Sequence, residues 1–407
     1  MNTLIVLFCI ATAVAVAAQR LRAPYTVALL TVGLVLGAFH LVEPPHLTKG
    51  LLFGVFLPGL LFEAAFNIEA SVFRRLWIAI AALAMPGVIV AMAITSVILV
   101  AALRGFGLAP DLAWGTAFVF SALIAATDPV AVTALFRQMS APRDLIVLIE
   151  GESLFNDGTA IVFLSLVLAH VSGTPGTGAS LVMDFVRIAG GGGVIGIVVG
   201  VAATLVIRRV NEPVIEIALT MIAAYGSFAL AEELHLSGVI ATVVAGMLCG
   251  NQLRGAARPA QGGSATSALE SFWEYIAFAL NSVVFLLIGF EVSMGSLLGS
   301  WREIVAAYVA VLIARTLIVF GGQLIASPFS RQIGPRPNAW SVVLVWGGLR
   351  GALSMVLALA LGADLEGRAL IVTMTTGVVI LTLLVQGLTM APLLRRLGLA
   401  AAGSADN

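Results

Sequence analysis

A dense group of carboxylates stands inside a segment that is otherwise apolar. Residues 150–157 read Glu-Gly-Glu-Ser-Leu-Phe-Asn-Asp. On a helix, Ser153 and Asp157 share one face because they are four residues apart, and Glu150 joins that face one turn earlier. Because a charged side chain at bilayer depth costs a few kcal/mol or more, this cluster predicts a functional site. Glu150 could instead lie hydrated near the cytoplasmic end of the segment.

A further carboxylate precedes this segment, in Thr127-Asp128-Pro129. Proline removes a backbone donor and clashes with the preceding turn, so the pattern predicts a broken helix with freed carbonyl groups near Thr127. Together with Asp157 and Ser153, these oxygens suit a small hard cation. Burial and mutual repulsion favour the protonated form of neighbouring carboxylates, so the same site could hold either a proton or a cation.

The composition indicates a polytopic membrane protein. Of 407 residues, 60% are hydrophobic and 10% are charged, whereas soluble domains carry about 25% charged residues. The net charge is zero, which gives no electrostatic case for a nucleic-acid partner. Cys9 and Cys249 both lie in apolar runs and suggest neither a disulfide framework nor a metal site, and we expect no cofactor.

Thirteen apolar runs can be counted, and most reach the roughly 20 residues that a spanning helix needs. They cover residues 2–18, 24–42, 50–66, 76–102, 112–136, 144–170, 179–207, 213–233, 236–250, 272–296, 303–326, 338–361 and 369–392. Basic residues concentrate in the odd-numbered connections, as at Arg74 and Arg75. The positive-inside rule therefore predicts an outer N-terminus and a cytoplasmic C-terminus, with a short cytoplasmic tail at residues 401–407. No Lys or Arg precedes the first run, which argues against a cleaved signal peptide.

The fifth and twelfth runs are interrupted at matching positions. The fifth contains Thr127-Asp128-Pro129, and the twelfth contains Gly347-Gly348-Leu349-Arg350-Gly351, whose glycines weaken a helix. If runs 1–6 and 8–13 are repeats, the interruptions occupy the same place in each. Paired broken helices in matching positions are typical of the binding site of an inverted-repeat transporter. The sequence thus predicts an all-α membrane fold with inverted repeats and crossing broken helices.

Other polar residues inside the runs admit more than one role. Arg315 needs an acidic partner, and Glu152 is the first candidate. Arg350 could compete for that role, or it could neutralise helix dipole ends at the interruption in the twelfth run. Asn156 suits a helix–helix hydrogen bond better than a ligand role. Glu63 could border the ion path or extend to the membrane surface.

The chain resembles the monovalent cation:proton antiporters, and most closely the sodium/proton exchanger branch that contains the NhaP-type prokaryotic proteins. The strings that carry the likeness are Thr127-Asp128-Pro129, Gly151-Glu152-Ser153-Leu154-Phe155-Asn156-Asp157 and Gly348-Leu349-Arg350-Gly351-Ala352. Motif order, spacing and helix count fit over essentially the whole chain. The resemblance implies a single transporter unit over residues 1–400, with a mobile core domain mainly of segments 3–6 and 10–13. It also implies a dimerisation domain mainly of segments 1–2 and 7–9, and a homodimer in a prokaryotic inner membrane.

The same resemblance implies which residues bind the ions. Asp157 looks like the principal carboxylate for both cation and proton. Asp128 and Ser153 look like further ligands, with the Thr127 carbonyl beside them.

Supporting roles are implied in the same way. Glu152 looks like the partner of Arg315. Asn156 stands where electrogenic relatives carry a second Asp, which implies electroneutral exchange. Glu63 resembles, more loosely, an acidic residue that lines the cytoplasmic approach.

The resulting hypothesis is a secondary transporter, not an enzyme, that exchanges Na+ or Li+ for H+ by alternating access. A K+/H+ antiporter with the same machinery is the alternative, because the motifs do not fix the cation. The expected partners are the cation, the proton and the lipid bilayer. An intramembrane aspartyl protease built on Asp128 and Asp157 is disfavoured, because neither aspartate lies in a Gly-x-Gly-Asp string. A cation channel would need no paired broken helices.

Overall fold

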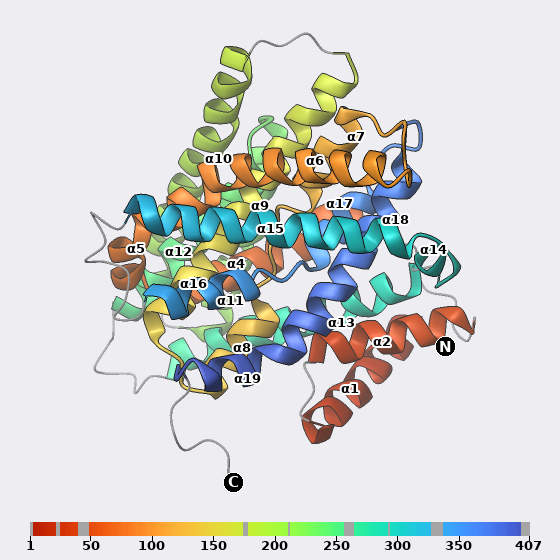
Figure 1. Ribbon diagram of the computed structural model, residues 1–407. Coiled ribbons are helices and arrows are strands. Elements are labelled where there is room, and N and C mark those ends of the chain that lie inside the picture. Colours follow the sequence, from red (N-terminus) through yellow and green to blue (C-terminus); the bar gives the residue numbers. More distant parts are fainter. Residues whose placement is uncertain are drawn as a thin grey trace. The chain divides into compact units, whose positions relative to one another are not determined.

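Helices form all of the regular structure in the part of the chain that the computed structural model describes (Figure 1). That part comprises residues 3–21, 25–39, 49–173, 178–210, 212–255, 264–291, 294–326 and 337–399. Seven of its helical stretches are long and apolar enough to cross a membrane, and four shorter helices are also apolar. The predicted all-α membrane fold is therefore confirmed. Thirteen crossings stay a prediction, and the predicted tail at 401–407 lies outside the described residues.

The helices gather into two compact units. The first unit spans Met1–His46, Arg75–Val171 and Ser282–Asn407. Its helices are α1 (Thr3–Leu21), α2 (Tyr25–Ala38), η2 (Leu83–Gly87), α6 (Val88–Gly105), α7 (Trp114–Leu123), α8 (Val130–Gln138), α9 (Arg143–Val171), α14 (Met294–Gly299), α15 (Trp301–Ala326), α16 (Pro337–Trp346), α17 (Ala352–Leu359), α18 (Arg368–Leu381), η5 (Thr382–Gly387) and α19 (Leu388–Arg396).

The second unit spans Leu47–Arg74 and Ser172–Asn281. Its helices are α3 (Lys49–Leu51), η1 (Leu52–Phe56), α4 (Leu57–Asn67), α10 (Gly178–Ile207), α11 (Pro213–Glu233) and α12 (Gly238–Gly255). Helices α5 (Ala70–Ala82) and α13 (Ser264–Glu291) contribute residues to both units. This unit groups the third predicted segment with segments 7–9. Which parts move and which dimerise stays a prediction.

Close backbone packing organises the second unit. Helix α12 packs against α4, α10 and α11. A Cβ atom at Gly192 or Gly196 of α10 would collide with a backbone carbonyl oxygen of Ser237 or Ala241. Small residues therefore let α10 and α12 touch along their backbones, as is common for membrane helices.

In the first unit, α6 lies alongside α15 (Figure 1) and also packs against α7, which contacts α9. Between α5 and α6, the helix widens into the π-helical turn η2, which contains Pro86 and packs against α9. The carbonyl of Ala84 in this turn accepts a hydrogen bond from Thr159 Oγ1 of α9 at 2.7 Å. Such turns frequently occur at functional sites, and here the contact fastens α9 to its neighbour.

Both predicted interruptions are present. The first interruption lies in the fifth predicted segment, and the second lies in the twelfth. Helix α7 ends at Leu123, and α8 begins at Val130, directly after Pro129. A residue before proline is biased towards extended backbone, which explains why the helix does not continue through Asp128. Helix α16 ends at Trp346, and α17 begins only after Gly351.

Candidate ion-binding site

The two interruptions meet backbone to backbone. The amide of Asp128 donates a hydrogen bond to the carbonyl of Leu349, with an N···O distance of 2.8 Å. Buried peptide groups need partners, and each broken helix leaves some of its own unpaired. This contact pairs one group from each interruption, and it brings Asp128 and Arg350 into one region.

Asp128 places its carboxylate at the beginning of two half-helices. Its Oδ1 accepts a hydrogen bond of 3.0 Å from the amide of Val130, the first residue of α8. The amide of Ala352, the first residue of α17, is a second backbone donor to the same carboxylate. Gly351 makes the approach possible, because a Cβ at that position would overlap the carboxylate. Helix N-termini carry partial positive charge, so one carboxylate balances two helix dipoles.

Two arginines face the opposite, C-terminal ends of the half-helices. Nη1 of Arg350 donates to the carbonyls of Ala125 and Ala126, just beyond α7, at 2.8 and 3.2 Å. Arg315 of α15 donates to the Leu344 carbonyl in the last turn of α16, from Nε at 3.2 Å and from Nη2 at 3.0 Å. Cations at helix C-termini complement the partial negative charge there. Arg350 therefore serves the interruption in the fifth segment, and not its own interruption.

Asn156 fastens the Thr127 peptide to α9. Its Oδ1 accepts a hydrogen bond from the Thr127 amide at 3.2 Å, and its Nδ2 donates to Thr127 Oγ1 at 2.8 Å. Thr127 Oγ1 also lies 2.7 Å from Ser153 Oγ. The structure thus brings Thr127, Ser153 and Asn156 together, and the hydrogen bonds of Asn156 join α9 to the non-helical chain between α7 and α8.

One carboxylate oxygen of Asp157 is buried and has no hydrogen-bond partner among the described residues. The Asp157 carboxylate accepts a hydrogen bond from the backbone amide of Thr127 and interacts electrostatically with Asp128, Glu152 and Arg350. Its Oδ1 is buried and accepts no hydrogen bond from any residue that the structure describes. Because a buried polar atom without a partner is costly, this oxygen is suited to a proton or a cation.

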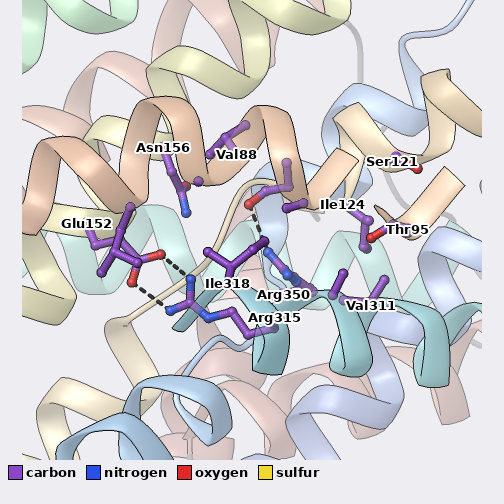
Figure 2. A pocket seen from close by; sticks show the side chains of 15 residues that line it. Val88, Thr95, Ser121, Ile124, Glu152, Asn156, Val311, Arg315, Ile318 and Arg350 are labelled. Carbon is purple, nitrogen blue, oxygen red and sulfur yellow. Dashed lines mark hydrogen bonds and ion pairs between the residues drawn. The ribbon is translucent and has the colours of Figure 1, made fainter. Parts of the chain in front are cut away.

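Glu152 and Arg315 form a two-pronged buried ion pair (Figure 2). Nη2 of Arg315 lies 2.6 Å from Oε2 of Glu152, and Nη1 pairs with Oε1. The side chains are 11% and 2% exposed, in that order. In the structure, Glu152 therefore pairs with Arg315 and not with Arg350. Because a buried charge needs a partner, this geometry suits a structural role.

A cavity of about 20 Å³ lies beside this ion pair (Figure 2). Its polar lining includes Thr95, Ser121, Asn156 and Arg350. Nε of Arg350 is buried and has no hydrogen-bond acceptor among the described residues. A space of this size holds about one water molecule. Asp128 and Asp157 do not border the cavity, so it is separate from the candidate ion ligands.

Two predicted residues have local partners of other kinds. Glu150 pairs with Arg137 at an N···O distance of 2.9 Å. Glu63 lies on α4, in the second unit, where its Oε1 accepts a hydrogen bond of 2.7 Å from Nδ2 of Asn67. A place for Glu63 on the ion path stays a prediction.

Reasoning from the sequence missed two contributors to the site. The space at Gly351 accommodates the Asp128 carboxylate, and the glycine after Arg350 in the interruption was a usable signal. Arg315 also caps α16 through Leu344. Nothing in the local sequence marks that contact, because it depends on how α15 approaches α16.

Comparisons with known proteins agree on one family. A family model described as "Sodium/hydrogen exchanger, transmembrane" matches residues 4–396. The low-affinity Na+/H+ antiporter NhaS1 of Synechocystis sp. is 38% identical over 387 residues, which cover 93% of this chain and 70% of that protein. The Na+/H+ antiporter NhaH of Halobacillus aidingensis is 32% identical over 411 residues, which cover 98% of each protein.

A solved structure supports the fold. The sodium proton antiporter MjNhaP1 from Methanocaldococcus jannaschii matches with a TM-score of 0.78 and 20% identity, over 97% of both chains. Because the family model and these relatives cover nearly the whole sequence, the chain belongs to the sodium/hydrogen exchanger family of membrane proteins.

Proposed function

We propose that this chain exchanges Na+ for H+ across a prokaryotic inner membrane, and that Asp157 binds either ion in turn. The observation that carries the proposal is Oδ1 of Asp157, which is buried, has no hydrogen-bond donor among the described residues and belongs to a carboxylate that interacts with Asp128. A proton would make Asp157 a neutral acid, and a cation would balance its charge. Relatives named as Na+/H+ antiporters support the same exchange.

The cation is held by oxygens from α9 and from the interruption in the fifth segment. Asp157 and Ser153 contribute from α9, while Asp128 and the Thr127 carbonyl contribute from the chain between α7 and α8. The Asp128 carboxylate keeps its place because two backbone amides bind it. Unwound backbone of this kind commonly coordinates ions in transporters with inverted repeats.

Coupling follows from one site that takes either one cation or one proton. Because the cation and the proton occupy the same site, one must leave before the other can bind. The site opens to one side of the membrane at a time. We assign the moving core mainly to segments 3–6 and 10–13, and the dimerisation domain of a homodimer mainly to segments 1–2 and 7–9. Asn156 adds no charge to the site, so exchange is one to one and electroneutral. The N-terminus lies outside and the C-terminus in the cytoplasm, as the basic residues indicate.

Reconstituted vesicles test this proposal. Asp157→Asn keeps nearly the same shape but can neither titrate nor balance a cation, so Na+-driven pH change should be abolished while the protein stays folded and inserted. Asp144→Asn is the matched control, because Asp144 lies on the same helix but pairs with the exposed Arg75. The control should exchange normally. Cation-driven proton flux in Asp157→Asn would disprove the assignment, and parallel assays with Li+, Na+ and K+ identify the cation.

A further inference from the structure

A buried hydroxyl outside the ion ligands holds the second interruption. Thr382, the first residue of η5, is 1% exposed. Its Oγ1 accepts a hydrogen bond from the amide of Arg350 at 3.2 Å, and it donates one to the carbonyl of Val379 at 2.9 Å. The hydroxyl therefore uses both its proton and an acceptor position inside the protein.

The first interruption has a contact of the same kind. There, the amide of Thr127 donates to Oδ1 of Asn156 at 3.2 Å. In each case, a single amide of the interrupted chain binds a polar side chain on the next long helical segment, which is α9 for Thr127 and α18–η5 for Arg350. The same form of attachment thus occurs in both halves of the protein, with different residue types.

The position of the Arg350 peptide affects more than this one hydrogen bond. From it, the guanidinium reaches the carbonyls of Ala125 and Ala126 beyond α7. The next residue, Gly351, lies against the Asp128 carboxylate, and the amide after it donates to that carboxylate. A shift of the Arg350 peptide would move these contacts together, and the orientation of Asp128 would change with them.

We propose that Thr382 is a positioning residue for the cation site. Its hydroxyl fixes the Arg350 peptide, and this holds the Asp128 carboxylate in the orientation that binds the transported cation. Thr382 acts only through Arg350 and Gly351 and does not touch the ion. The inference rests on the exchange proposed above.

The test compares three variants by the Na+ dependence of exchange in vesicles. Thr382→Val removes the hydroxyl at similar size, and Thr382→Ser retains it. Thr376→Val is the matched control. The Thr376 hydroxyl is buried in the same segment, but among the described residues it bonds only the Val372 carbonyl of its own helix. We expect Thr382→Val to raise the apparent KM for Na+ by roughly three- to tenfold, the equivalent of one lost hydrogen bond, with a maximal rate close to that of the wild type. Thr382→Ser and Thr376→Val should keep the wild-type KM.

Several outcomes would overturn the inference. An unchanged KM in Thr382→Val, or an equal rise in Thr382→Ser or Thr376→Val, would show that the hydroxyl does not position the site. A fall in melting temperature without a change in KM would assign Thr382 to stability alone. If Thr382→Val does not fold, Thr382→Ala removes the same hydroxyl with less bulk and is measured instead. A wild-type protein without Na+-driven proton flux would refute the proposed function itself, which is a different result.

Discussion

Both interruptions leave backbone peptide groups without partners in their own helices, but the two carry opposite charges. The chain between α7 and α8 carries Asp128 and the oxygens of Thr127, and it supplies negative charge and the proposed ligands. The chain between α16 and α17 carries Arg350 and Gly351, and it supplies positive charge and space. The comparison shows that two broken helices of similar build can take different parts in one site.

The ends of the half-helices differ in how they are capped. One carboxylate, that of Asp128, binds the first residues of both α8 and α17. The C-terminal ends have separate arginines, because Arg350 comes from the opposite interruption and Arg315 comes from α15. The end of α7 is therefore capped by a residue of the other interruption, where the two broken helices cross. The end of α16 is capped by a residue from α15, outside this crossing.

The largest effect should come from the arginine outside the crossing. Arg315→Ala and Glu152→Ala should each lower the free energy of unfolding by about 3–5 kcal/mol, because each leaves a lone buried charge. Arg315→Ala should be the worse of the two, since the Leu344 carbonyl also loses its donors. The double variant should cost less than the sum. Reversible unfolding in mixed micelles measures all three, and simple additivity would contradict the pairing.

The next largest effect is expected from filling the space at Gly351 in the second interruption. Gly351→Ala should cost about 1–3 kcal/mol, because the added methyl group must displace the Asp128 carboxylate or its own backbone. Exchange should fall with it, since Asp128 is a proposed ligand. Gly362→Ala is the control, because its Cβ would meet nothing within 4 Å. Equal exchange rates in the two variants would show that Gly351 is not needed by the site.

A smaller effect on stability, but a change in transport, is expected at Asn156. Asn156→Asp can still accept from the Thr127 amide but, when ionised, cannot donate to Thr127 Oγ1, so it should cost about 0.5–1.5 kcal/mol. Its new charge should make exchange depend on membrane potential, which acts with about 2.3 kcal/mol per charge per 100 mV. Vesicles clamped with valinomycin and K+ report this through the Na+-driven pH change. Wild-type flux should not respond to the clamp, and a steep response would rule out electroneutral exchange.

The smallest effect should come from a charge outside both interruptions. Arg75 pairs with Asp144, and these side chains are 55% and 35% exposed. Arg75→Gln should change the free energy of unfolding by only about 0–1 kcal/mol, because water screens such pairs. Unfolding and exchange assays should match the wild type. If Arg75→Gln lowered the free energy of unfolding as much as Arg315→Ala, removal of any charge on these helices would be equally harmful. The special importance of the charges at the interruptions would then be contradicted.

Much of the fold could be predicted because its signals are local. Pro129 breaks one segment and a run of glycines breaks the other, and both effects act within a single turn. The spacing of Ser153 and Asp157 likewise requires only helical geometry. The partner of Glu152 could be narrowed to Arg315 or Arg350, since a buried charge must have a partner.

The remaining features depend on tertiary approach. Which arginine caps which half-helix is decided by how α15 and the two interruptions meet. Thr382 is one threonine among several in an apolar segment, and no pattern distinguishes it from Thr376. One of the boundaries between the compact units falls between Arg74 and Arg75. It lies inside helix α5, where no break in the helix marks it.

The double cap on Asp128 has a consequence for turnover. A carboxylate offers about four lone-pair directions, and two backbone amides engage two of them. The two remaining lone-pair directions can face an ion. Ion binding and helix capping therefore use different lone pairs of the same carboxylate. A cation can therefore enter and leave without freeing the first turn of α8 or α17. In the proposed cycle, the two backbone hydrogen bonds to Asp128 are therefore retained, and only the charge balance around them changes.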